Sequence, residues 1–289
     1  MQNKLMSLVT KTVKQGRAQA TSAIQPARYL NGLAKSQVGQ GKTVLVTGAS
    51  SGLGEVMARL FAKLGYNLAI CARRGERLEQ LKVDLLQSYP NIRVEYKILD
   101  VSDYESIFKV FDEFAADFGH LDRIVVNAGV GDSRRIGKGR FKINRRTAEI
   151  NFISALAQCE AAMKIFREQN AGHLVVISSM SAMRGLPGHM TTYGAAKAGI
   201  AHLAEGIRAD MLLTELPIKV TTIYPGYIRT EINKDAKPLP FEVDADTGTK
   251  AIVAAIESGA EEACVPSLPW SIVGQAMKHL PLQIVSKIS

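Results

Sequence analysis

A glycine-rich turn between a predicted strand and a predicted helix constrains the fold of this 289-residue chain more than any other feature. The β-branched run Thr43–Val46 is typical of a buried strand, and the amphipathic pattern that ends at Lys63 is typical of a helix. Between them lies Thr47–Gly54, with the sequence TGASSGLG. Glycines at such a turn let backbone N–H groups and the helix N-terminus approach a phosphate without obstruction by Cβ atoms. The arrangement indicates a dinucleotide-binding turn.

Strand and helix patterns alternate along the rest of the chain. This alternation predicts an α/β fold with a doubly wound parallel sheet in a single domain, residues 42–265. A basic arm, residues 1–41, precedes this domain, and an apolar tail, residues 266–289, follows it. The predicted strands are Thr43–Val46, Asn67–Ala72, Arg93–Leu99, Arg123–Val126, the run Gly172–Ser179, Lys219–Tyr224 and Ala263–Val265. Six helices are predicted. The first ends at Lys63, the second covers Glu76–Gln87, the third begins near Tyr104, the fourth begins at Thr147, the fifth contains Tyr193 and extends to Leu213, and the sixth covers Asp246–Ser258.

Charged and polar residues follow several of these strands. In a dinucleotide fold the end of the second strand meets the adenosine ribose, where an acid binds a free 2′-hydroxyl and an arginine accommodates a 2′-phosphate. Arg73 and Arg74 stand there without an acid, which favours NADP over NAD. Asp100 follows the third strand and could bond an adenine amino group or cap the next helix. After the fourth strand, Asn127-Ala128-Gly129 predicts a turn that passes close to the cofactor.

Tyr193 and Lys197 stand four residues apart in an alanine-rich segment that favours helix, so both side chains share one face. A cation held near a tyrosine favours the phenolate and lowers the phenol pKa toward the range of proton exchange at neutral pH. Upstream, an apolar strand pattern ends in Ser178 and Ser179. Because ligands of open α/β sheets bind at the carboxyl ends of strands, a serine hydroxyl there is placed to bond a reacting oxygen.

The net charge of +9 is concentrated in two segments. Residues 1–42 hold seven basic residues and no acid, and residues 132–146 hold seven basic residues and one acid. No nucleic-acid motif accompanies either segment, so we do not expect nucleic-acid binding. The second segment is interpreted as a loop that is either solvated or receives an anionic substrate group. Three cysteines without close pairing argue against a disulfide framework or a metal site and favour reduced core residues: Cys71, Cys159 and Cys264.

The two ends of the chain and one internal segment leave alternatives open. The acid-free arm could be a disordered tail, a membrane-surface or subunit-binding arm with a weak helical pattern at Leu5, Val9 and Val13, or a targeting sequence. Residues 231–241 are predicted to be a mobile lid. The apolar tail has helical spacing interrupted by Pro281; it could pack on its own core, cover the substrate mouth, contact another subunit or rest on lipid. We expect a cytoplasmic protein that could attach to a membrane surface.

In their order and spacing, these motifs resemble those of the short-chain dehydrogenase/reductase family. The resemblance covers residues 42–265 and rests on the glycine turn, Asn127-Ala128-Gly129, Asn151, Ser179, Tyr193-x-x-x-Lys197 and Pro225-Gly226. It implies a seven-stranded Rossmann-type sheet and four catalytic residues. Tyr193 would be the general acid/base, Lys197 would lower its pKa and bind the nicotinamide ribose, Ser179 would orient the substrate oxygen, and Asn151 would hold a water. Val126 stands where the family often has a first asparagine, and the Ser179–Tyr193 interval is one residue longer than usual, so Ser178 and Ser181 are alternatives to Ser179.

The predicted function is NADP(H)-dependent interconversion of a carbonyl and an alcohol, on a lipophilic substrate because the lid and tail contribute apolar residues. A 3-oxoacyl thioester reductase whose carrier phosphate meets the basic loop is the alternative, and a non-catalytic NADPH-sensing protein is a further one. The family resemblance also implies a homo-dimer or homo-tetramer, built through the helices that carry Asn151 and Tyr193. The predicted cofactor-binding residues are Gly48, Ser50, Ser51, Gly52, Leu53, Gly54, Arg73, Arg74, Asp100, Val101, Asn127, Ala128, Gly129, Tyr193, Lys197, Pro225, Gly226, Ile228 and Thr230.

Overall fold

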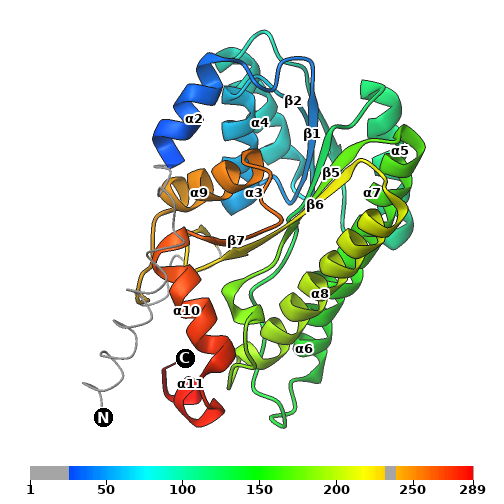
Figure 1. Cartoon of the computed structure of the whole chain (residues 1–289). Coiled ribbons are helices and arrows are strands. Elements are labelled where there is room, and N and C mark those ends of the chain that lie inside the picture. Colours follow the sequence, from blue (N-terminus) through cyan, green and yellow to red (C-terminus); the bar gives the residue numbers. More distant parts are fainter. Residues whose placement is uncertain (1–25, 232–238, 289) are drawn as a thin grey trace.

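Seven parallel strands form one sheet in the computed structural model, which describes residues 26–231 and 239–288 (Figure 1). Their order is β3-β2-β1-β4-β5-β6-β7, and this confirms the predicted doubly wound, Rossmann-type sheet. The chain turns back at β1, which pairs with β2 on one side and with β4 on the other. The strands are β1 (Thr43–Thr47), β2 (Asn67–Ala72), β3 (Val94–Ile98), β4 (Arg123–Val126), β5 (Gly172–Ile177), β6 (Ile218–Pro225) and β7 (Glu262–Val265).

Helices cover both faces of the sheet, so its central strands are apolar throughout. All five residues of β1 are buried: Val44 and Val46 pack into one core layer and Leu45 into the other. The first layer is formed with α2 (Pro26–Lys35), α3 (Gly52–Lys63), α4 (Gly75–Ser88) and α9 (Ala245–Glu257). The second is formed with α5 (Tyr104–Phe118), α7 (Ser154–Gln169) and α8 (Met190–Thr214).

Two details of the predicted helices were wrong. Asp100 does not cap α5; its carboxylate accepts bonds from the N–H and hydroxyl of Ser102, and Asp103 caps α5 by accepting from the Ser106 N–H at 3.2 Å. The helix expected from Thr147 begins earlier, as α6 (Phe141–Ala148), so the predicted basic loop is partly helical. Neither glycine nor proline occurs within α6, so nothing interrupts the helix there.

The described parts of the arm and of the tail also pack on the body. The helix α2 lies against α9 and buries Leu30, which the sequence analysis did not anticipate. The tail forms α10 (Ser267–His279) and α11 (Leu282–Ile288), separated at Pro281 as predicted, and it buries Trp270 and Val285. None of the helices in residues 26–231 and 239–288 is long and apolar enough to cross a bilayer. The pattern at residues 5–13 and most of the predicted lid, residues 232–238, lie outside the described residues.

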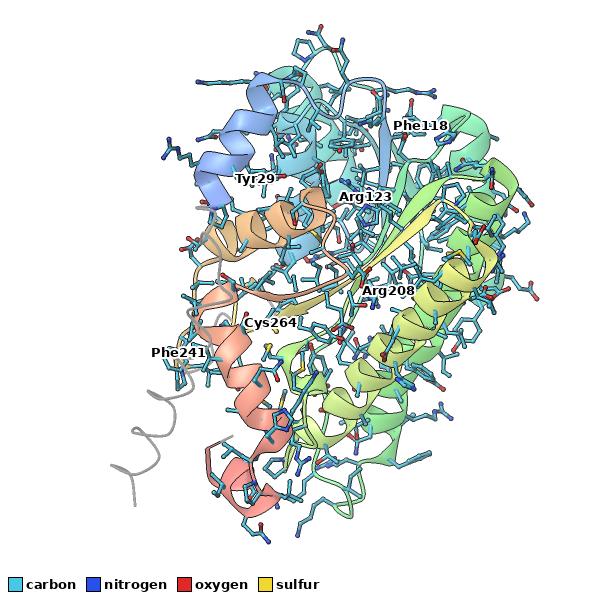
Figure 2. All side chains as sticks on the ribbon, viewed as in Figure 1. Tyr29, Phe118, Arg123, Arg208, Phe241 and Cys264 are labelled. Atoms are coloured by element: carbon cyan, nitrogen blue, oxygen red, sulfur yellow. The ribbon has the colours of Figure 1, made fainter. Side chains whose placement is uncertain are left out.

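A buried polar network joins the sheet to α9 at the edge opposite the carboxyl ends of the strands. Arg123, labelled in the interior in Figure 2, pairs with Glu257 at 2.5 Å, and its Nε donates to His173 Nδ1 at 3.2 Å. The ring proton of His173 is therefore assigned to Nε2, which lies 2.8 Å from Thr221 Oγ1. Burial, together with the charge of Arg123, lowers the pKa of His173 to about 3.

We expect this histidine to make stability fall on acidification. The unfolded chain binds a proton near pH 6.5 but the folded chain only near pH 3, so stability is present above 6.5 and is lost as the pH falls toward 3. Glutamine cannot titrate, so in His173→Gln the free energy of unfolding should fall less steeply below pH 6 than in the wild type. The two slopes should differ by about 1.4 kcal/mol per pH unit. Urea unfolding at stepped pH measures the two slopes, and equal slopes would contradict the assignment.

Candidate active site

A cleft of about 630 Å³ opens at the carboxyl edge of the sheet, beside the point where the strand order reverses. The ends of β1, β4, β5 and β6 and the first turn of α8 contribute to its walls. All the predicted catalytic and cofactor-binding residues line this cleft except Gly54, which is buried behind the glycine turn. The structure thus brings together residues that the sequence scatters from position 48 to position 230.

The glycine turn leaves no room for a side chain at Gly48 or Gly54. Gly48 has φ +68°, and a Cβ on Gly54 would lie 2.3 Å from the backbone oxygen of Gly48. Thr47 Oγ1 accepts the N–H groups of Asn127 and Ala128 at 3.0 and 3.1 Å, which ties the turn after β1 to the turn after β4. The N-terminus of α3 therefore borders the cleft with bare backbone, and this cradle fits the pyrophosphate of a dinucleotide.

Next to this cradle, Arg74 donates to the hydroxyl and the backbone oxygen of Ser50, both at 3.2 Å. Glu231, which follows β6, crosses the cleft edge and pairs with Arg74 at 3.4 Å and with Arg77 at 3.0 Å. The hydrogen bond from Arg77 lowers the pKa of Glu231, so the carboxylate is charged at neutral pH. Sequence reasoning missed both Arg77 and Glu231. Arg77, one helical turn after Arg74, could have been found from that spacing.

Asn151 lies in a π-helical turn, Glu149–Ile153, between α6 and α7. Its side chain is fully buried: the amide nitrogen donates to the Val130 carbonyl at 2.8 Å, and the amide oxygen accepts the Val130 N–H at 3.1 Å. A Cβ on Gly129 would lie 2.7 Å from that amide oxygen, so the backbone here must be glycine. The Asn151 side chain thus positions the turn after β4, and its expected role of holding a water stays a prediction.

Tyr193 and Lys197 lie on the same face of α8, one turn apart, against the end of β5. Lys197 Nζ donates to the carbonyl of Ile177 at 2.9 Å. The hydroxyl of Ser178 donates to the backbone oxygen of Lys197 at 2.7 Å, which anchors the helix to the strand end. The Ser179 side chain lies near the Tyr193 phenol and favours its ionised form, and the Ser179 hydroxyl oxygen accepts the Ser181 N–H at 3.2 Å.

Proximity to the phenol distinguishes the three candidate serines. Ser178 lines the cleft, but its hydroxyl donates to the backbone oxygen of Lys197 in α8. Ser181 is buried and does not line the cleft. Ser179 lines the cleft and is the one of the three that influences the pKa of the Tyr193 phenol, so the arrangement favours Ser179.

Burial sets the proton affinities of the two α8 groups. It raises the pKa of Tyr193, and the nearby Ser179 side chain counteracts part of the rise. The expected net lowering of this pKa is not what the structure gives, because the cost of burying a phenolate outweighs the stabilising contacts. Burial also lowers the pKa of Lys197 to about 8, so the ammonium is charged at pH 7 but loses its proton at mildly alkaline pH.

An aromatic cluster lies beside the cleft, and its member Tyr227 lines the cleft. Trp270 of α10 packs edge-on against Tyr227 and Phe241, with ring centroids 5.1 and 6.2 Å apart. A Cβ on Gly226 would lie 2.1 Å from the Trp270 ring, so glycine after β6 is what lets the indole pack there. Phe241, at the outer edge of the molecule in Figure 2, is 58% exposed. The C-terminal tail therefore packs behind the cleft wall, through the contact of Trp270 with Tyr227.

Comparison with known proteins supplies the context for this site. A family model described as short chain dehydrogenase matches residues 42–239. An uncharacterized oxidoreductase of Mycobacterium tuberculosis is 44% identical over 246 residues, which cover 85% of this chain and 96% of the relative.

Solved structures with the same fold carry either form of nicotinamide cofactor. An alcohol dehydrogenase from the archaeon Thermococcus sibiricus, complexed with 5-hydroxy-NADP, has 25% identity and a TM-score of 0.69, covering 78% of this chain and 97% of that one. A short chain dehydrogenase/reductase from Burkholderia phymatum, in complex with NAD, has 19% identity and a TM-score of 0.75, covering 87% and 97%. The extent of the family match and the identity to the mycobacterial relative settle the classification: the chain belongs to the short-chain dehydrogenase/reductase family and is an oxidoreductase of that family.

Proposed function

We propose that this protein is an NADP(H)-dependent reductase that converts a lipophilic ketone or aldehyde into an alcohol. The observation that carries the proposal is the proximity of Ser179 to the Tyr193 phenol, with Lys197 one turn away, inside the cleft that the glycine turn borders. The raised pKa of Tyr193 keeps its phenol protonated at neutral pH, as a general acid requires. The protonated phenol is the form that reduction requires near pH 7.

Each of these residues has a distinct task. When bound, the nicotinamide supplies the hydride. The Ser179 hydroxyl orients the substrate oxygen, and the Tyr193 phenol donates its proton to that oxygen as negative charge develops. Lys197, held by the Ile177 carbonyl, presents its ammonium to the ribose hydroxyls and stabilises the phenolate that remains. Asn151 fixes the turn after β4 that forms one side of the pocket.

Two further features support the substrate class and the assembly. The pocket wall and rim are apolar, with Met190, Tyr227 and Leu239 lining the cleft and Trp270 behind them, as a lipophilic substrate requires. A shallow hollow of about 290 Å³ between α7 and α8 presents Leu156, Met163 and Leu203. We propose these two helices as the contact surface of a homo-dimer or homo-tetramer.

The first test replaces Tyr193 with Phe, which removes the transferable proton and preserves the ring. NADPH-dependent reduction should fall by at least about a hundredfold, because general acid catalysis typically contributes that much. The assay panel runs from short aldehydes through long-chain ketones to 3-oxoacyl thioesters. Thr192→Ser, on the neighbouring position of α8, is the control and should retain activity. Equal turnover of Tyr193→Phe would refute the proposed acid, and a panel led by thioesters would favour the carrier-thioester alternative.

The second test concerns the 2′-phosphate of NADP. Arg74→Ala should weaken NADPH binding more than NADH binding, because the guanidinium at Ser50 is the proposed phosphate contact. Glu231→Gln should strengthen NADPH binding up to about fivefold, since a carboxylate no longer competes for Arg74 and Arg77. Calorimetric titration measures both cofactors, with the exposed Glu168→Gln as control. An equal loss of both cofactors in Arg74→Ala would contradict the assignment.

The third test uses the lowered pKa of Lys197. As the pH rises past about 8 the ammonium loses its proton, and kcat/KM for reduction should fall with it. In Lys197→Arg the guanidinium stays charged, so the fall should move to higher pH even if the overall rate is lower. Initial rates from pH 6 to 10 give the two profiles. A fall at the same pH in both proteins would assign the titration to another group.

A further inference from the structure

Three segments lie beyond the carboxyl edge of the sheet, and we call them together the mouth face because two of them reach the cleft at Val130, Gly131 and His189: residues 130–146, residues 183–189, and α10 with α11. Ser133 donates to the His189 carbonyl, and a Cβ on Gly188 would lie 3.7 Å from Arg135. On the other side, a Cβ on Gly274 of α10 would lie 3.0 Å from Met180, just before the second segment. Figure 1 shows the segment before α6 and the α10–α11 pair at the same end of the molecule.

The mouth face has a strong positive charge. Residues 130–146, 183–189 and 266–286 hold nine lysines and arginines and one acid, Asp132. Asp132 pairs with Arg134, and Arg145 pairs with Glu149 of the neighbouring π-turn. Within the described part of the chain, the remaining basic side chains of this face form no ion pair: Arg135, Lys138, Arg140, Lys142, Arg146, Arg184 and Lys278.

Large apolar side chains stand exposed among these charges. Phe141 is 75% exposed and Ile136 is 61% exposed, and both lie within the basic segment before and at the start of α6. In the tail, Leu268 lies in the first turn of α10 and Leu282 begins α11, and both are more than half exposed. Basic residues with apolar side chains between them are typical of surfaces that lie at the boundary of an anionic bilayer.

We propose that the mouth face docks on an anionic lipid surface, with Lys138 and Lys142 at the headgroups and Ile136, Phe141, Leu268 and Leu282 inserted beside them. These four apolar residues belong to separate segments and do not line the cleft, which fits an extended lipid surface better than a peptide or a small anion. Docked this way, the cleft opens toward the bilayer. If the proposed function holds, the lipophilic carbonyl substrate then enters the cleft from the membrane, past Phe241 and Trp270.

The test measures binding of the full chain to vesicles of phosphatidylcholine alone or mixed with phosphatidylglycerol. The wild type should bind only the mixed vesicles, and less strongly at high salt. Lys138→Glu/Lys142→Glu should weaken binding at least about tenfold, and Ile136→Ser/Phe141→Ser should weaken it comparably. Co-sedimentation with the vesicles, in place of tryptophan fluorescence, gives the bound fraction of each protein, because the only tryptophan of the chain, Trp270, is buried.

Matched controls lie elsewhere on the molecule. Lys35→Glu/Lys109→Glu makes the same charge change on α2 and α5, and Leu212→Ser/Leu213→Ser removes exposed apolar groups at the far end of α8. Both controls should bind like the wild type. Wild-type binding that ignores anionic lipid, or Lys138→Glu/Lys142→Glu binding unchanged, would overturn the proposal. A wild-type protein that retains an acidic carrier protein but does not bind the vesicles would also overturn the proposal.

A failure of the proposed function is distinguishable from a failure of docking. Tyr193→Phe should bind vesicles as the wild type does, because the phenol lies inside the cleft. Lys138→Glu/Lys142→Glu should retain turnover of a water-soluble carbonyl and lose turnover of a carbonyl embedded in vesicles. Equal turnover of the embedded substrate by this variant would overturn the docking proposal and leave the assignment of Tyr193 intact.

Discussion

The close approach of α3 to the end of β1 is the constraint on which the site depends. At Gly54 a single added carbon would lie 2.3 Å from the backbone oxygen of Gly48, so the helix can begin here only as bare backbone. Because β1 pairs with β2 on one side and β4 on the other, this helix start coincides with the reversal of strand order. The crevice at that reversal is where the carboxyl ends of neighbouring strands diverge, and every other part of the site is arranged around it.

Burial at this edge of the sheet disfavours the charged forms of the residues that the proposed chemistry uses. Lys197 is buried and donates to the backbone carbonyl of Ile177, and burial lowers its pKa because a charge is costly to keep there. Tyr193 is shifted the other way for the same reason. As a result, at neutral pH the Tyr193 phenol is protonated, and the Lys197 ammonium one turn away is close to the pH at which it loses its proton. Such perturbed pairs are typical of functional sites, whereas His173, perturbed at the opposite edge, belongs to a fully bonded structural network.

Sequence reasoning succeeded where the determinant lies within one element. The spacing of Tyr193 and Lys197 places both on one helix face, and the glycine turn predicts its own conformation, so neither depended on the tertiary structure. It failed where distant segments meet: Glu231 reaches Arg77 across 154 residues of sequence, and no local pattern contains that contact. The direction of the Tyr193 pKa shift was also inaccessible, because burial is a property of the folded chain.

The positive charges around the cleft fall into two groups that differ in how they are balanced. At the end of β2, Arg74 and Arg77 converge on one carboxylate, Glu231, so their field is local and directed at a single anionic group. On the mouth face the basic side chains are spread over separate segments, and among the described residues only Arg134 and Arg145 have acidic partners. A converging pair with a competing anion suits discrimination between cofactors. A dispersed field with exposed Phe141 and Ile136 inside it suits a surface that is itself extended and charged.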